Sequence, residues 1–130
     1  MNMRDPKLPP VLADIDSHTH AMSIPIESVV EQLVDLLGLT MVAAIGGVGE
    51  TRAVQQWIAG REPQRPNVLR FALQVALMIA TPVDKSVARA WFQGSNPLLG
   101  DRIPAMMLRN EALEDVQGPL MGAARSFASR

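Results

Sequence analysis

Two histidines one residue apart are the first residues of this sequence that could do chemistry. They stand in the segment Asp16-Ser17-His18-Thr19-His20. Neutral imidazole is a common metal ligand, so two rings at this spacing could hold one metal ion between them. Such a site would need further ligands from elsewhere in the chain, and the sequence contains no third histidine and no cysteine.

The His18 and His20 pair resembles the His-x-His motif of metal-dependent amidohydrolases and related deoxyribonucleases. Those enzymes take their remaining ligands from later strands of a barrel of about 250 residues. This chain has 130 residues, about half that length. We therefore expect no metal site, and a flexible polar segment around the two histidines.

The other signatures of catalysis are also missing from the sequence. No thiol nucleophile is available, because the cysteine count is zero. The nearest approach to a nucleotide-binding loop is Gly46-Gly47-Val48-Gly49, which lacks both a preceding strand pattern and a following Lys and Ser or Thr. We expect neither an enzyme nor a cofactor.

Composition places the chain among globular proteins. A hydrophobic fraction of 48% in 130 residues is enough for one packed core. The longest apolar tract, residues 71–83, is interrupted by polar residues and proline and is shorter than the roughly 20 residues that span a bilayer. The N-terminal residues do not resemble a signal peptide. We expect no membrane span and a cytoplasmic protein.

Apolar periodicity predicts an all-α fold. Residues 1–22, with their prolines and no periodic pattern, are expected to form a flexible, disordered arm. Helices are expected at residues 26–37, 41–45, 50–59, 67–80, 82–93, 104–109 and 111–128, with a kink or restart at Gly118-Pro119. Helix N-caps are expected at Ser23, Thr40 and Thr81. The nearly all-apolar helix at residues 67–80 should be central, with Leu77, Met78 and Ile79 either in the core or in an oligomer contact.

The segment from Leu39 to Trp57 resembles the helix-turn-helix of Xre and lambda-repressor-like regulators. The resemblance rests on Leu39-Thr40, a short helix, Gly47-Val48, Ala53-Val54 and Trp57. A second helix locked in this way can enter the major groove. The candidate DNA contacts are the polar face and the basic residues after it: Thr51, Arg52, Gln55, Gln56, Arg61, Arg65 and, less directly, Arg70. Residues 47–70 carry four arginines and two glutamates, a net charge of +2 against −1 for the chain. A purely structural three-helix unit explains the same pattern equally well.

A second resemblance covers residues 26–128. The order Ala88-Arg89-Ala90-Trp91-Phe92, then Asn96-Pro97-x-Leu99, Gly100 and Pro104, is similar to the toxin-binding domain of the Xre/MbcA/ParS antitoxin family. This resemblance implies an all-helical antitoxin, commonly a homodimer, that neutralises a RES-domain toxin acting on NAD and can bind its own operator DNA. It also implies that the chain terminus approaches the NAD pocket of the toxin, which points to Arg125, Ser126, Ser129 and Arg130. From the residues themselves, the Trp91–Pro104 stretch is a turn that closes a core.

The resulting hypothesis divides the chain into an arm at 1–22, a degenerate helix-turn-helix at 23–65 and a helical toxin-binding domain at 66–130. It predicts an antitoxin that blocks a toxin by steric occlusion. A stand-alone DNA-binding regulator without a toxin partner is the alternative, and a scaffold that oligomerises through residues 67–80 is a third possibility.

Overall fold

The computed structural model describes residues 10–80 and 84–129, with side chains from residue 15 onward. Within these residues it contains eight α-helices and one 3-10 helix, and no strand. The helices are α1 (Pro10–Ser23), α2 (Ile26–Leu37), α3 (Leu39–Ile45), α4 (Thr51–Ile58), α5 (Pro66–Ile79), α6 (Ser86–Gln93), η1 (Pro97–Leu99), α7 (Pro104–Asn110) and α8 (Leu113–Ala128). The predicted all-α class is confirmed. Residues 1–9, the predicted cap at Thr81 and the candidate residue Arg130 lie outside the described residues.

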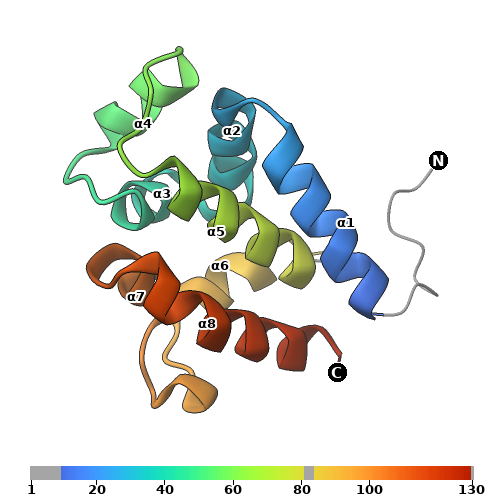
Figure 1. Cartoon of the computed structure of the whole chain (residues 1–130). Helices are drawn as coiled ribbons and strands as arrows, with labels where there is room; N and C mark the ends of the chain where they lie inside the picture. The colour runs from blue at the N-terminus through green and yellow to red at the C-terminus, as the bar shows by residue number, and fades with distance from the viewer. Residues whose placement is uncertain (1–9, 81–83, 130) are drawn as a thin grey trace.

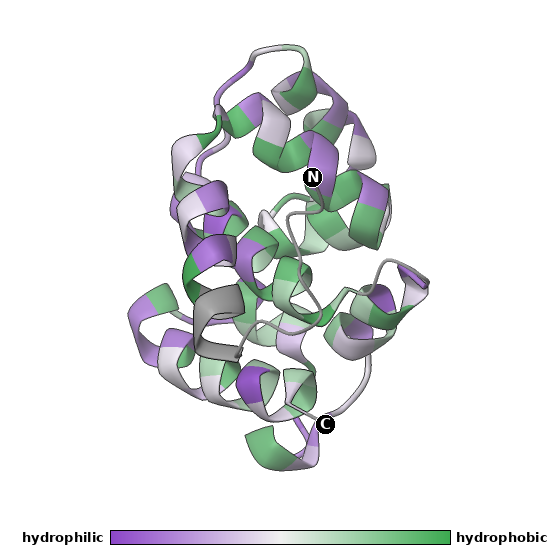
Figure 2. Ribbon diagram, turned by 90° about the vertical axis from the view of Figure 1, so that its right-hand side faces the viewer, coloured by the Kyte–Doolittle hydropathy of each residue, from purple (hydrophilic) through white to green (hydrophobic). Residues whose placement is uncertain are grey.

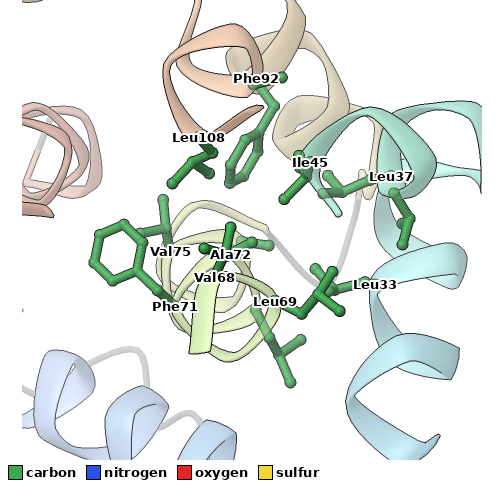
Figure 3. Close-up of a cluster of buried hydrophobic side chains, with 14 of the residues drawn as sticks. Leu33, Leu37, Ile45, Val68, Leu69, Phe71, Ala72, Val75, Phe92 and Leu108 are labelled. Carbon is green, nitrogen blue, oxygen red and sulfur yellow. The ribbon is translucent and has the colours of Figure 1, made fainter. Parts of the chain in front are cut away.

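Helix α5 is the centre of the molecule, as its sequence predicts. Nine of its residues are buried, and Gln74 is the polar one among them. Helices α1, α2, α3, α6 and α8 contact it, and α1 and α8 run beside it (Figure 1). Side chains from α2, α3, α6 and α7 converge on α5 in Figure 3, among them Leu33, Ile45 and Phe92. Of the cluster expected in a core or an oligomer contact, Ile79 is buried, while Leu77 and Met78 are half-buried against the core.

Helices α2, α3 and α4 follow one another as predicted, but the N-caps of α2 and α3 differ from the predicted ones. Helix α2 begins after Pro25, and Ser23 belongs to the end of α1, where its hydroxyl donates to the carbonyl of His20 at 3.3 Å. Thr40 lies inside α3, whose N-cap is Gly38. The predicted caps at Ser23 and Thr40 are therefore wrong. In both cases the chain changes direction one or two residues away from the hydroxyl, so the hydroxyl cannot reach the first free amides.

The double glycine after α3 has a packing role. A Cβ at Gly46 would lie 2.5 Å from the ring of Trp57, which is far too close, so glycine is needed for α4 to approach the end of α3. Gly47 has a φ of 82°, a left-handed conformation that favours glycine. Trp57 and Val54 bury the inner side of α4. Alternating bands of apolar and polar residues along the outer helices are visible in Figure 2, as expected for amphipathic helices.

Helix α1 corrects the predicted flexible arm. Most of the predicted arm, from Pro10 onward, belongs to a helix that ends at Ser23 and packs along α5. Ser17 and Ala21 are buried, whereas Ile15 and Met22 are exposed. From residue 15 onward, where side chains are described, the buried residues of this helix are small ones and not the large apolar ones that define a stripe, so the sequence pattern does not indicate it.

Helix α6 ends at Gln93 as predicted, but it begins at Ser86 instead of residue 82, and residues 84 and 85 are not helical. The carboxylate of Asp84 accepts from the backbone N–H of Ser86 at 2.9 Å and also from its hydroxyl, and these bonds hold the pKa of Asp84 below its usual value. Trp91 and Phe92 pack edge to face, with ring centroids 5.2 Å apart. Asn96 then accepts from the N–H of Leu98 at 3.0 Å and starts η1. Within η1 Leu99 is buried, whereas Leu98 is 60% exposed.

The last two helices complete the core. Pro104 starts α7 as predicted, and Leu108 on that helix is buried. Helix α8 continues through Pro119 without interruption, so of the predicted kink or restart at Gly118-Pro119 the restart is wrong. Val116, Leu120 and Ala124 form the stripe that packs α8 against its neighbours, and this packing outweighs the one backbone hydrogen bond that proline removes. No helix in the described residues is long and apolar enough to cross a membrane.

Candidate functional site

The outer face of α4 carries the residues that the sequence singled out for DNA contact. Arg52 and Gln55 are exposed, and Thr51 and Gln56 are half-buried. They lie on the side opposite the buried Val54 and Trp57, so the structure brings these four polar residues onto one accessible face. Arg61 follows the helix, is exposed, and donates to the side-chain carbonyl of Gln56 at 3.2 Å.

Arg65 does not belong to that face. Its guanidinium donates to the carbonyl oxygens of Leu108 at 2.7 Å, Arg109 at 3.2 Å and, more weakly, Ile45 at 3.4 Å. The side chain is half-buried, and it joins the end of α3 to the end of α7. These hydrogen bonds occupy both Nη atoms of Arg65 and argue against the predicted phosphate contact. The last carbonyls of a helix have no partner within it and carry a partial negative charge, so they attract the guanidinium group.

Arg70 was the less direct candidate, and it also points inward. Its Nη1 donates to the carbonyls of Ala21 at 3.0 Å and Ile24 at 2.8 Å, at the connection between α1 and α2. With Arg65 and Arg70 engaged in this way, the exposed charged groups of residues 47–70 are Arg52 and Arg61 against Glu50 and Glu62. The charge that this segment presents to a partner is thus close to balanced instead of +2.

Arg109, which was not among the candidates from sequence, acts with Arg65. Its Nη1 donates to the carbonyls of Ala44 at 3.0 Å and Val48 at 3.1 Å, on either side of the double glycine. An arginine in the last turn of a short helix is a known C-terminal signal. That signal could have identified Arg109 as a capping residue, although not which helix end it would cap.

The C-terminal candidates lie in the last turn of α8. Arg125 and Ser126 are exposed. The hydroxyl of Ser129 donates to the carbonyls of Arg125 at 2.7 Å and Ser126 at 3.3 Å, so it satisfies the end of its own helix. In Figure 1 this end of α8 lies at the lower right and α4 at the upper left, so the two candidate surfaces are at opposite ends of the molecule.

Two hollows flank the turn between α6 and α7. One of about 160 Å³ lies between that turn and α8, and its lining includes Trp91, Leu98 and Phe127. The other, of about 300 Å³, is lined by Ile103 and Met106 among others. The exposed fractions are 60% for Leu98, 37% for Ile103 and 41% for Met106. We call these three side chains the apolar rim.

The apolar rim is concentrated in a short part of the chain. Five large apolar residues are exposed in the part of the chain whose side chains are described, and the other two are Ile15 and Met22 on α1. Sequence patterning could not find the rim, because Leu98, Ile103 and Met106 have the same residue types as the buried Leu99, Met107 and Leu108 beside them.

The two histidines face different helices. His18 Nδ1 lies 3.2 Å from Oε1 of Gln74 on α5, and His20 Nε2 lies 2.8 Å from Oε1 of Gln32 on α2. Among residues whose side chains are described, no group of three or more His, Asp or Glu side chains is close enough to hold a metal ion. The histidines therefore tie α1 to the rest of the fold.

No protein-family model matches this chain, and neither a curated protein nor a solved structure matches it.

Proposed function

We propose that the protein is an antitoxin of a type II toxin-antitoxin pair that binds a RES-type toxin and occludes its NAD site. The apolar rim is the observation that carries the proposal. Leu98 lines one hollow, and Ile103 and Met106 line the other, so three exposed large apolar side chains stand within residues 98–106. Exposed apolar surface of this kind marks a protein contact. This rim lies in the Trp91–Pro104 stretch and the first turns of α7, the part of the chain that resembles the toxin-binding domain.

The geometry around the rim suits steric occlusion. The hollow beside Leu98 is closed on its other side by Phe127 of α8, one residue from Ser126 and two from Arg125. A toxin seated on the rim would therefore also meet the last turn of α8. That turn is held by packing of the α8 stripe, so the surface is formed before binding and little ordering entropy is lost. The mechanism requires no chemistry, and it places the protein in the cytoplasm, where the NAD pool of the cell is consumed.

Co-expression with a RES-domain toxin encoded by a neighbouring gene, once such a gene is identified, tests the proposal. The full chain should copurify with the toxin and preserve cellular NAD. Leu98→Asp and Met106→Asp should each weaken the complex, because an aspartate would be desolvated in the interface. Ile15→Asp and Met22→Asp are matched controls, since they place the same charge on exposed apolar residues of α1 and should leave the complex intact. The proposal fails if wild-type protein neither copurifies nor protects NAD.

The α4 face favours DNA binding as a second candidate function, either as autoregulation by the antitoxin or as the sole role of a regulator. Arg52 and Gln55 are the observation behind it, because their exposed side chains have the donors that read guanine and adenine in the major groove. A homodimer would present two such helices to two half-sites.

A gel shift with DNA from the promoter of its own gene tests this second function. Arg52→Ala and Gln55→Ala should each weaken binding, and Arg125→Ala, at the opposite end of the molecule, should not. Equal losses from all three variants would exclude α4 as the reading helix.

A further inference from the structure

Arg65 and Arg109 meet where two helices end. Helix α3 ends at Ile45 and helix α7 at Asn110. The Arg65 guanidinium reaches the last carbonyls of both helices, and Arg109 reaches from α7 back to Ala44 and Val48. Helices α3 and α7 are also in direct contact. The two side chains thus cross between segments more than 40 residues apart in sequence.

Elementary electrostatics explains why two cations gather at this place. The last carbonyls of a helix have no partner within it and carry a partial negative charge. Two such ends lie together here. Neither residue that follows these helices, Gly46 or Glu111, satisfies them with a side chain, so the two guanidinium groups take over the capping.

Arg65 and Arg109, which we call the arginine clamp, also influence the position of α4. Gly46 lies between the two carbonyls that Arg109 holds, and the ring of Trp57 from α4 rests against Gly46. Gly47 lies beneath Arg65, since a Cβ there would be 3.3 Å from both Cδ and Nη1 of that arginine. Holding Ala44–Val48 therefore also holds the surface on which α4 sits.

We propose that Arg65 and Arg109 are positioning residues that fix α4 and its polar face relative to α7. The functional consequence rests on the second candidate function, DNA binding, whereas the positioning itself does not depend on it. Arg65 then supports the reading helix from behind, and Arg52 and Arg61 are the arginines left to contact DNA.

Hydrogen exchange on the full-length protein tests the positioning. The amides of Gly46, Gly47 and Val48 donate to carbonyls of α3 and report the state of this turn. Arg65→Lys and Arg109→Lys should each speed their exchange on the order of tenfold, because lysine cannot reach several carbonyls at once. Arg70→Lys is the matched control, since Arg70 caps carbonyls at the α1–α2 connection and should loosen that region instead. The proposal is overturned if the turn is unaffected, or if Arg70→Lys affects it equally.

The salt dependence of DNA binding separates positioning from phosphate contact. Each phosphate contact contributes about 0.9 to the slope of log K against log salt. Arg61→Ala should lower the slope by about that amount. Arg65→Ala should reduce affinity while leaving the slope unchanged, and a lower slope would return Arg65 to a phosphate-contacting role and overturn the proposal. If the wild-type protein binds no DNA, the second candidate function fails. The proposed positioning role of Arg65 and Arg109 is then tested by hydrogen exchange alone.

Discussion

Helices α1 and α8 both pack along α5, yet they are held by different forces. Helix α8 presents a stripe of buried residues that includes Val116, Leu120 and Ala124. In α1, the buried residues of the part with described side chains are Ser17 and Ala21, and the helix is tied by polar contacts from His18 and from Arg70. Helix α8 is thus attached mainly by apolar burial, whereas the described side chains of α1, from residue 15 onward, contribute little large apolar burial and are joined to α5 by hydrogen bonds.

This difference explains why one helix can be predicted from its own sequence and the other cannot. An apolar stripe can be recognised from the residues of the helix that carries it. The hydrogen bond from Arg70 to a carbonyl of α1 cannot, since any residue at position 21 offers a carbonyl. Helical periodicity therefore predicts α8 but not α1.

The largest expected effect is in the α8 stripe. Leu120→Ala should lower the free energy of unfolding by about 2–5 kcal/mol, because Leu120 is 1% exposed and its removal leaves a cavity. Urea unfolding followed by circular dichroism measures this loss. Ile15→Ala in α1 is the control, and at 56% exposure it should change stability by less than about 0.5 kcal/mol. Similar losses in both variants would show that α1 also depends on apolar burial.

Pro119→Ala should raise the free energy of unfolding by up to about 3 kcal/mol, since alanine restores an N–H donor inside a continuous helix. Thermal unfolding measures the gain. Gly118→Ala gives a scale for it, because a Cβ there meets nothing within 4 Å and should add about 1 kcal/mol. If Pro119→Ala gained nothing, the packing of α8 would already compensate fully for the missing hydrogen bond.

The fold was largely predictable where large apolar residues or strong turn residues determine it. The centre at α5, the end of α2 at Gly38 and the turn at Asn96-Pro97 all follow from residue type and spacing. The helix N-caps were not predictable, as Ser23 and Thr40 show. A cap depends on where the chain turns, and a small shift takes the hydroxyl out of reach of the first free amides of the helix.

The candidate surfaces were predictable only in part. The polar face of α4 follows from helical spacing. The engagement of Arg65 with carbonyls was not predictable, because an arginine just before α5 has the same sequence signal whether it faces solvent or the carbonyls of Leu108 and Arg109. The apolar rim was not predictable, since exposure of Leu98 depends on how η1 sits on the fold.

The next effect concerns the tie between α5 and α1. Arg70→Ala should lower stability by about 1–3 kcal/mol, because the carbonyls of Ala21 and Ile24 lose a charged donor. Limited proteolysis should then cut α1 before α8, and Arg70→Lys should restore part of the protection. Cleavage of α8 first would contradict the assignment of polar contacts to α1.

The smallest expected effect is that of the other polar tie. His18→Ala removes the contact with Gln74, a residue that is 5% exposed. The variant should lower the free energy of unfolding by about 0.5–1.5 kcal/mol. His18 bonds one side-chain oxygen, whereas Arg70 caps two carbonyls, so the loss should be smaller than for Arg70→Ala. His20→Ala is the matched control: it breaks the contact with half-buried Gln32, where water can replace the imidazole at little cost. Thermal unfolding of the three variants should rank them Arg70, His18, His20, and a larger loss at His20 than at His18 would mean that α1 is held mainly by α2 and not by α5.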